Sequence, residues 1–340
     1  MLERIPLTWL RRPRNKVTAL VAALSIPGVA LSADAKATFT TFNPGGVYGT
    51  DAAGINDAGT ITGDYGYSAL NAHGFVRSAG GTITTFDPPG STSTLPMSIN
   101  DAGVIAGLYY GGSTGTGFVR AADGTFTAFG VPNSWTYPRA INRKGAITGF
   151  YEDNSGVQAF LRSPGGKITK IIPDGSGETA TYTINSSSVV TGFYVDGNGM
   201  SHGFTANAKG SITTIDVPQA LGTEGFGIND AGDVTGDYYD GNFLSHGFVR
   251  TASGQITTFD VPQCTGAKPL RINNLGLITG TCADSKNRTV GFVRHANGNI
   301  STFRAPEARF TEVEDMNDKG QITGKFEDRK EPIEGFVRIP

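Results

Sequence analysis

The sequence predicts an all-β fold, a seven-bladed β-propeller built from four-stranded antiparallel blades. Three observations predict it: one short segment recurs seven times, each copy holds four strand-like runs, and the two chain ends carry complementary parts of one copy. Repeats of about 40–45 residues with four strands each are the sequence signature of a propeller.

The recurring segment has an Ile-Asn or Met-Asn step followed by glycine and β-branched residues. It reads GINDAGTITG in the first copy and GINDAGDVTG in the fifth. The spacings between successive asparagines are 44, 42, 43, 44, 44 and 44 residues. The asparagines are Asn56, Asn100, Asn142, Asn185, Asn229, Asn273 and Asn317.

Four strands are expected in each repeat. The fifth repeat contains the runs GFGIN, DVTGDYY, SHGFVR and QITTFDV, in which apolar and polar residues alternate with the period of a strand. The connections DAG and TASG are rich in residues that accept the positive φ of tight hairpin turns.

The chain ends predict that the ring is closed by the two termini. The segment ATFTTFNP (37–44) matches the fourth strand of a repeat, whereas the carboxyl end stops at EGFVRIP, a third strand with no fourth after it. Pairing these ends would complete the last blade and remove an exposed sheet edge. We therefore expect one propeller domain over residues 36–340.

The first 35 residues predict an export signal. A segment with five basic residues (Arg4, Arg11, Arg12, Arg14 and Lys16) precedes the apolar run VTALVAALSIPGVAL (17–31), and ADA (33–35) offers a small-residue cleavage site. The prediction is a secreted protein, extracellular or periplasmic, that is a monomer without a membrane span after cleavage. An uncleaved anchor is the alternative.

Charge and motifs exclude several classes of function. The full chain has a formal net charge of −2, and without residues 1–35 it has 23 basic and 28 acidic residues. This mildly acidic body gives no reason to expect nucleic acid as a partner. No phosphate-binding loop occurs, and we expect no cofactor.

Several polar residues that resemble catalytic groups recur from blade to blade. His246 has counterparts in His73 and His202, and Arg250 and Asp260 repeat in the same way. One active site needs one set, so we interpret these residues as structural. We further expect Arg250 to pair with Asp230 in the first hairpin turn and so to link neighbouring blades.

A family resemblance rests on tripeptides that follow hairpin signals. His202-Gly203-Phe204 and Gln158-Ala159-Phe160 each follow a hairpin turn that contains asparagine and glycine, and they resemble the bacterial "probable extracellular repeat, HAF" family. The resemblance covers nearly all of 37–340, although this chain mostly has glycine where the family name has alanine. It implies an exported repeat protein of propeller type and no assigned chemistry.

Candidate site residues lie where the repeat varies. The turns between second and third strands and the crossings between blades share one side of the ring, which we call the crossing face, and variable loops on a regular scaffold are where sites occur. Aromatic and charged residues there suit a saccharide, peptide or protein ligand. The candidates are Trp135, Tyr137, Arg139, Tyr182, Glu224, Phe226, Lys268, Arg271, Glu312 and Glu314. Ordinary solvated loop residues are the alternative.

Two further candidates occupy the second strands. Asp64 and Asp237 stand where three other repeats have Leu108, Phe150 and Phe193, and either carboxylate could point towards the channel. Carboxylates there could serve acid–base chemistry, although blades one and five are not neighbours and a salt-pairing role is the simpler interpretation.

Metal binding is not expected, whereas a disulfide is. The histidines are distributed one to a blade, too far apart to share zinc, and the DGN segments lack the alternating oxygen ligands of a calcium loop. Folding the sixth repeat about its NNLG turn places residue 267 opposite Cys282, within reach of Cys264. Two such cysteines in an exported chain predict a disulfide, with two free thiols as the alternative.

From these observations we expect a non-catalytic propeller that binds a polar small molecule, glycan or protein on its crossing face. The alternative is a propeller-fold lyase or hydrolase that acts on an extracellular polymer, with Asp64, Asp237, Glu224 or Arg139 as candidate actors. A purely structural surface repeat is the third hypothesis.

Overall fold

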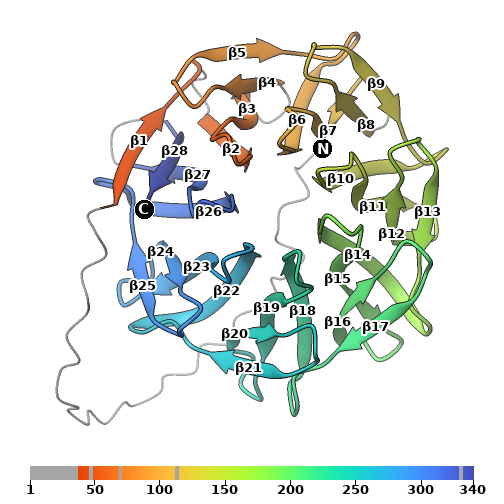
Figure 1. Ribbon diagram of the computed structural model, residues 1–340, viewed down its shortest axis with the longest axis vertical. Helices are drawn as coiled ribbons and strands as arrows, with labels where there is room; N and C mark the ends of the chain where they lie inside the picture. Colours follow the sequence, from red (N-terminus) through yellow and green to blue (C-terminus); the bar gives the residue numbers. More distant parts are fainter. Residues whose placement is uncertain (1–36, 46–48, 69–70, 112–114, 329–331) are drawn as a thin grey trace.

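The chain folds into seven four-stranded antiparallel sheets arranged radially around a central axis (Figure 1). The computed structural model describes residues 37–340 except 46–48, 69–70, 112–114 and 329–331, and every regular element in that part is a β-strand. The predicted seven-bladed propeller is confirmed, whereas the predicted export signal at 1–35 lies outside the described residues. No helix long and apolar enough to cross a membrane occurs in the described part.

In each blade the first strand lies nearest the axis and the fourth forms the outer edge (Figure 1). Blades 1 to 4 contain β2 (Gly49–Ile55), β3 (Ile61–Ser68), β4 (Asn71–Arg77) and β5 (Ile83–Phe86); β6 (Ser93–Ile99), β7 (Ile105–Tyr110), β8 (Gly115–Arg120) and β9 (Phe126–Phe129); β10 (Trp135–Ile141), β11 (Ile147–Asp153), β12 (Gly156–Arg162) and β13 (Ile168–Ile171); β14 (Ser176–Ile184), β15 (Val190–Asp196), β16 (Ser201–Ala206) and β17 (Ile212–Ile215).

Blades 5 to 7 follow the same order, except that the last blade takes its outer strand from the amino-terminal end of the described chain. They contain β18 (Gly222–Ile228), β19 (Val234–Tyr239), β20 (Ser245–Arg250) and β21 (Ile256–Phe259); β22 (Cys264–Ile272), β23 (Ile278–Asp284), β24 (Thr289–Arg294) and β25 (Ile300–Phe303); β26 (Phe310–Met316), β27 (Ile322–Glu327), β28 (Glu334–Ile339) and β1 (Thr38–Phe42).

The ring closes where β1 pairs with β28. The pairing is antiparallel and runs from Thr38 opposite Ile339 to Phe42 opposite Gly335. This strand exchange confirms the predicted closure by the two ends of the domain. It gives the edge of β28 a partner within the same chain, so that edge is not left open to other strands.

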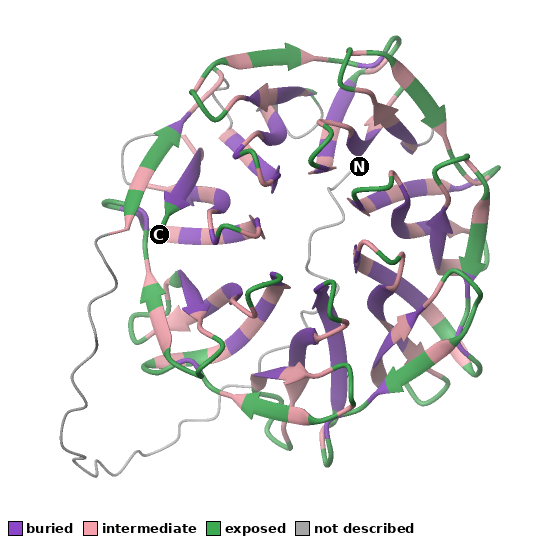
Figure 2. Ribbon diagram, in the orientation of Figure 1, coloured by how far each residue is buried: buried purple, intermediate pink, exposed green. Residues whose placement is uncertain are grey.

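One phenylalanine in each third strand forms the centre of its blade. These seven residues have no exposed surface, and they are Phe75, Phe118, Phe160, Phe204, Phe248, Phe292 and Phe336. Six of the blades add a buried threonine on the second strand, such as Thr235, whose hydroxyl donates to the carbonyl oxygen of Phe248 at 2.7 Å. Burial is therefore concentrated in the middle strands, while the outer strands are largely exposed (Figure 2).

The repeated asparagines form a closed ring of hydrogen bonds around the axis. Each side-chain Nδ2 donates to the main-chain carbonyl oxygen of the asparagine in the next blade, and Asn317 closes the circle by donating to Asn56. The seven distances lie between 2.9 and 3.3 Å. The Oδ1 atom of each asparagine meanwhile accepts main-chain N–H groups of its own hairpin turn. Aspartate could supply the acceptor but not the donor, which explains the residue type.

The repeated arginines link neighbouring blades, but not through the partner expected from the sequence. Arg250 does not pair with Asp230, which instead accepts the main-chain N–H of Ser186. In five blades the guanidinium lies over a phenylalanine ring from the fourth strand of the preceding blade, at 4.7–5.0 Å from the ring centroid. The pairs are Arg77 with Phe42, Arg120 with Phe86, Arg162 with Phe129, Arg294 with Phe259, and Arg338 with Phe303.

The repeated histidines also have a structural partner. His246 Nδ1 lies 2.6 Å from a carboxylate oxygen of Asp260, and its ring stacks on Tyr238. His73 and His202 make the corresponding contacts with Asp87 and Asp216. Each of these three histidines therefore has an aspartate partner in its own blade, as a structural role requires.

We predict that Arg294→Ala destabilises the protein more than Arg250→Ala does. Both guanidinium groups donate to the next carbonyl oxygen, but Arg250 has Ile215 in place of a phenylalanine beneath it. The difference between the two variants should be about 0.5–2 kcal/mol, the usual size of a cation–π contact. Urea unfolding measures it, and equal losses would show that the stacking contributes nothing.

We also predict that Asn273→Asp costs about 1–3 kcal/mol of unfolding free energy, because it removes a buried donor and leaves the carbonyl oxygen of Asn317 without it. The exposed Asn242→Asp is the control and should change stability little. Denaturant titration at pH 7 tests both variants, and the prediction fails if the two losses are the same.

Candidate functional site

The innermost strands contain β-bulges, each of which leaves one residue outside the regular cross-strand pairing. In blade 5 the register shifts between Gly225 and Gly227, which leaves Phe226 without a cross-strand partner. Glycine at 236 on the facing strand makes this possible, because a Cβ atom there would collide with the carbonyl oxygen of Glu224. Bulges commonly re-aim side chains in this way. The corresponding residues in other blades are Met97, Arg139, Tyr182, Leu270 and Glu314.

Four of the predicted site residues form a continuous row across blades 3 to 6. The Arg139 guanidinium lies 5.5 Å from the ring centroid of Tyr182, whose ring meets that of Phe226 edge-on at 5.1 Å. Lys268 Nζ lies over the other end of this row, 5.0 Å from the Phe226 centroid. The row combines cation–π contacts with an aromatic pair.

Charged residues of blades 7 and 1 form a second cluster. Lys325 Nζ lies 2.8 Å from Asp51, 3.0 Å from Glu314 and 3.6 Å from Glu312. Burial raises the pKa of Glu314, and the nearby carboxylates of Asp51 and Glu312 add to the rise, while Lys325 opposes it. The two predicted residues Glu312 and Glu314 thus share one lysine.

The row and the cluster approach each other across the axis. Burial lowers the pKa of Arg139, while the charges of Tyr182, Glu314 and Asp51 raise it and that of Arg271 lowers it. The groups that act on Arg139 therefore belong to blades 4, 6, 7 and 1, which brings the row and the cluster into one electrostatic neighbourhood. Arg271, also predicted, is held by Asp315, with 2.9 Å between Nε and Oδ1.

Glu224 and Asp237 form a buried pair of carboxyl groups. They lie directly opposite each other on β18 and β19, and each residue is only 2 % exposed. Glu224 Oε2 and Asp237 Oδ1 have no hydrogen-bond partner among the described residues. Burial raises the pKa of both, the charge of Asp237 raises that of Glu224 further, and Lys268 opposes the rise. Two neighbouring carboxyl groups that are both hard to ionise can hold a proton at neutral pH.

Trp135 and Tyr137 lie outside this central group. Trp135 contacts the ring of Tyr110 at 5.7 Å, and Tyr137 stacks on Phe150 at 5.0 Å. Burial raises the pKa of Tyr137. Asp64, from blade 1, is buried with 6 % of its surface exposed. Asp64 lies directly opposite Asp51 of the charged cluster in the β2–β3 pairing, so the structure brings ten of the twelve candidates together around the axis.

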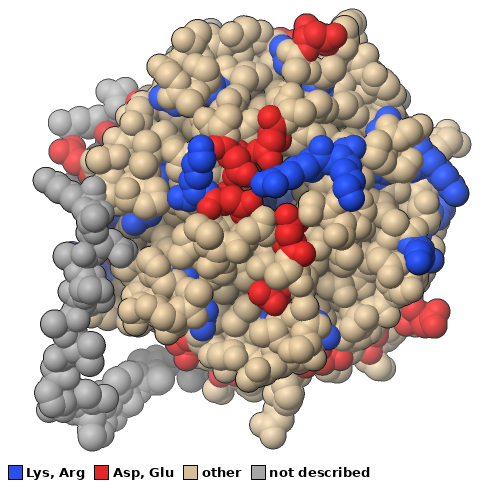
Figure 3. Space-filling model, in the orientation of Figure 1, with Lys and Arg blue, Asp and Glu red and all other residues tan. Residues whose placement is uncertain are grey.

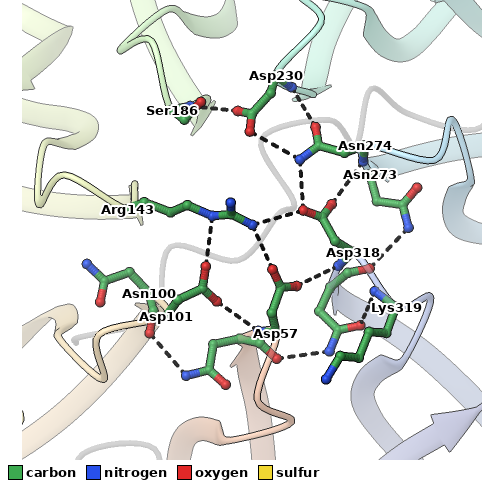
Figure 4. A network of polar contacts seen from close by, with 12 residues as sticks. Asp57, Asn100, Asp101, Arg143, Ser186, Asp230, Asn273, Asn274, Asp318 and Lys319 are labelled. Atoms are coloured by element: carbon green, nitrogen blue, oxygen red, sulfur yellow. Dashed lines mark hydrogen bonds and ion pairs between the residues drawn. The ribbon is translucent and has the colours of Figure 1, made fainter.

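On the face opposite the crossings, a hollow of about 190 Å³ lies on the axis and is lined by the Ile-Asn steps of all seven blades. Arg143 reaches across its mouth to Asp57 at 2.7 Å, Asp101 at 2.8 Å and Asp318 at 3.1 Å (Figure 4). Acidic side chains accordingly gather around a basic one at the centre of this face (Figure 3). Arg143 therefore satisfies three carboxylates that would otherwise repel one another.

A larger hollow of about 760 Å³ opens on the crossing face between blades 6 and 7. We call it the blade 6–7 cleft. It lies among the β23–β24 turn, the crossing that follows β25, and the start of the segment after β27. Residues that line it include Arg288, Arg304, Glu307, Arg309, Phe310 and Glu327.

None of the twelve site residues predicted from the sequence lines the blade 6–7 cleft, so the sequence analysis missed this feature. A signal for it was nevertheless present in the repeat. Arg304 stands where other repeats have the aspartate that binds histidine, such as Asp260, and Val290 stands in the position of His246. The structural pair is therefore lost in blade 6, and the charge at the crossing is inverted.

The described residues contain no group of three or more histidine, cysteine, aspartate or glutamate side chains arranged to hold a metal ion. Each histidine with a repeat counterpart is instead engaged by an aspartate of the same blade.

The two cysteines form a disulfide, as the sequence predicted. Cys264 begins β22 and Cys282 lies near the end of β23, with their Cα atoms 5.9 Å apart. The strand register places Ala267 opposite Cys282, which is the pairing expected from folding the chain about its turn. The bond ties the crossing before blade 6 to the second strand of that blade.

Comparison with family models found no match, and no curated protein matched the sequence. Solved structures do match. A streptogramin B lyase is 14% identical with a TM-score of 0.60, and the match covers 88% of this chain and 97% of that one. A virginiamycin B lyase from Staphylococcus aureus with quinupristin is 16% identical with a TM-score of 0.59, covering 90% and 100%.

The propeller domain of the Trilobed protease from Pyrococcus furiosus is 8% identical with a TM-score of 0.62, and the match covers 85% of this chain and 92% of that one. That domain is described as having an open velcro topology, whereas the present ring is closed by β1 and β28. At these identities the likeness establishes the propeller fold alone.

We predict that Glu224→Gln changes how stability depends on pH. The difference in stability between this variant and the unsubstituted chain should shift in favour of the variant as the pH rises from 5 to 9. Folding raises the pKa of Glu224 to about 8 and that of Asp237 to about 7, above the values of about 4 in unfolded chains. The folded state therefore binds these protons more tightly, and the stability that they contribute is lost as the pH rises from about 4 to about 8. Thermal melts from pH 5 to 9 test this, with the exposed Asp174→Asn as control. An unchanged pH profile would contradict the prediction.

Proposed function

We propose that this chain is an exported propeller that binds a polar ligand, either a saccharide, a peptide or a protein segment, on its crossing face. The observation that carries the proposal is the blade 6–7 cleft, whose volume of about 760 Å³ is that of a ligand pocket. Its lining combines arginine, glutamate and an aromatic ring, which together suit a ligand with several hydrogen-bonding groups.

The hydrogen bonding of polar side chains differs between the two faces of the ring, and this difference supports the crossing face as the binding face. On the opposite face, polar side chains of the hairpin turns are engaged with one another through the asparagine ring and Arg143. On the crossing face, by contrast, the side chains differ from blade to blade. Individual side chains on a regular scaffold are what specific recognition requires.

Export is supported by the disulfide between Cys264 and Cys282. Disulfides persist in oxidising compartments such as the periplasm and the extracellular space, and are rare in the cytosol. The amino-terminal basic and apolar segments point in the same direction.

An enzymatic function is the second candidate, and the Glu224–Asp237 pair favours it. A carboxyl group that keeps its proton at neutral pH can act as a general acid, and an ionised partner can act as a base. The pair lies close to Lys268, which could stabilise negative charge. A lyase or hydrolase acting on an extracellular polymer would use these groups.

We predict that the chain without residues 1–35 binds members of an array of oligosaccharides and peptides, and that Phe310→Ala weakens the binding of the selected ligand by about tenfold. Phe310 lines the cleft, whereas Phe243, which is 62% exposed in blade 5, does not, so Phe243→Ala is the matched control. Calorimetry measures affinity, and mass spectrometry follows the ligand for product.

Binding with an intact ligand would support the binding function. Product release that Asp237→Asn abolishes would instead establish the enzymatic one. Equal affinity of the Phe310→Ala protein and the unsubstituted chain would remove the cleft from the proposal, and the absence of any ligand would overturn it.

A further inference from the structure

The blade 6–7 cleft brings together three arginines from two loops. Arg288 comes from the turn between β23 and β24, while Arg304 and Arg309 come from the crossing between blades 6 and 7. Glu307, Glu327 and Asp328 line the same hollow, so it contains acceptors as well as donors. A ligand that uses both kinds of group must carry acceptors for the arginines and donors for the carboxylates.

Arg288 is held in place before any ligand arrives. Its Nε and Nη2 atoms lie 2.8 and 2.6 Å from Asp284 Oδ2, while Asp284 Oδ1 accepts the main-chain N–H groups of Lys286 and Arg288. These contacts lower the pKa of Asp284 to about 2, so the carboxylate stays ionised across the neutral range. A guanidinium fixed through one edge keeps its remaining N–H donors available in a defined direction.

The disulfide stiffens the strand end that carries Asp284. Cys264 lies directly opposite Asp284 in the β22–β23 pairing and is bonded to Cys282, two residues earlier on β23. Asp284, and through it Arg288, therefore projects from a cross-linked hairpin. This arrangement lowers the conformational entropy that ligand binding would otherwise cost.

Arg304 and Arg309 complete the basic part of the cleft. Both are exposed, and no hydrogen bond or ion pair of their guanidinium groups occurs within the described ranges. The main-chain N–H of Arg309 donates to the carbonyl oxygen of Glu327 at 2.6 Å, which anchors this residue to the edge of blade 7. Arg304 is free to face the cleft because its repeat position has lost the histidine partner.

Phe310 adds an apolar surface at the wall of the same hollow. It begins β26 and is half-buried, so part of its ring surface is available. Sugar rings present apolar C–H faces together with hydroxyl groups. Carboxylates such as Glu307 and Glu327 accept hydrogen bonds from hydroxyls.

We propose that the blade 6–7 cleft binds an anionic saccharide, whose carboxylate or sulfate group contacts Arg288, Arg304 and Arg309 while its sugar ring packs on Phe310. Hydroxyl groups of the sugar donate to Glu307 and Glu327. The guanidinium forks match the planar oxygens of a carboxylate in two-point hydrogen bonds. The inference rests on the proposed function, because it names the class of ligand for that site.

The test compares defined probes by calorimetry at low and physiological salt. Hexagalacturonate and a sulfated hexasaccharide carry the two kinds of anion, maltohexaose is the neutral counterpart, and hexaglutamate supplies carboxylates without sugar rings. At least one anionic saccharide should bind about tenfold or more tighter than maltohexaose, with an affinity that falls as salt rises. The comparison between the two anionic probes identifies the anionic group.

Variants locate the site. Arg304→Gln and Arg309→Gln should each weaken the anionic probe about tenfold without unfolding the protein, because both side chains are exposed. Lys209→Gln, an exposed basic residue on the opposite face, should leave the affinity unchanged. Asp284→Asn should weaken binding of the anionic probe while maltohexaose is unaffected, which identifies Asp284 as a positioning residue rather than a structural one.

Four outcomes decide between the proposals. Equal or tighter binding of maltohexaose would overturn the inference while leaving the proposed function standing. Preference for hexaglutamate would replace the saccharide with an acidic peptide. Anion binding that Lys209→Gln weakens as much as Arg304→Gln would show non-specific attraction and overturn the site. The absence of binding to every probe and to the wider array would overturn both.

Discussion

The hydrogen-bonded ring of seven asparagines is the constraint on which the rest of the molecule depends. Each asparagine closes its own hairpin turn with Oδ1 and joins the next blade with Nδ2, so one side chain fixes both the local turn and the angle between blades. Because the last asparagine donates to the first, the ring is complete only when seven blades are present. The paired termini close the same circle at its outer edge. Local geometry and overall symmetry are thus set by the same bonds.

The other repeated polar residues also make contacts that hold the blades together. Few of them therefore remain available for catalysis or ligand binding. Arginines stack on phenylalanines of the preceding blade, and histidines are held by aspartates of their own blade. The departures from the repeat are informative for the same reason. Ile215 removes the ring beneath Arg250, and Arg304 with Val290 removes a histidine–aspartate pair. In the second case Arg304 lines the blade 6–7 cleft.

Two arrangements compete for the role of functional site, and they differ in chemistry. The axis holds charges that are mostly paired with one another, such as Lys325 among three carboxylates, together with the Glu224–Asp237 pair, whose pKa values are raised by burial. The blade 6–7 cleft is open, and the guanidinium groups of Arg304 and Arg309 in its lining make no ion pair with another described residue. Buried charges that satisfy one another hold strands in register, whereas exposed donors on a stiffened hairpin are better suited to an incoming ligand.

The sequence by itself determined the fold, the number of blades, the closure by the chain ends and the disulfide, because each follows from periodicity and from strand register counted about a turn. It also separated repeated structural residues from individual ones. Only the tertiary structure decided which individual residues meet. The bulges at Arg139 and Tyr182 break the strict alternation of side chains along a strand. The pairing of Glu224 with Asp237 likewise depends on the strand register beside the bulge at Phe226. The blade 6–7 cleft lies between loops of two repeats, so its shape depends on the angle between blades, which no single repeat encodes.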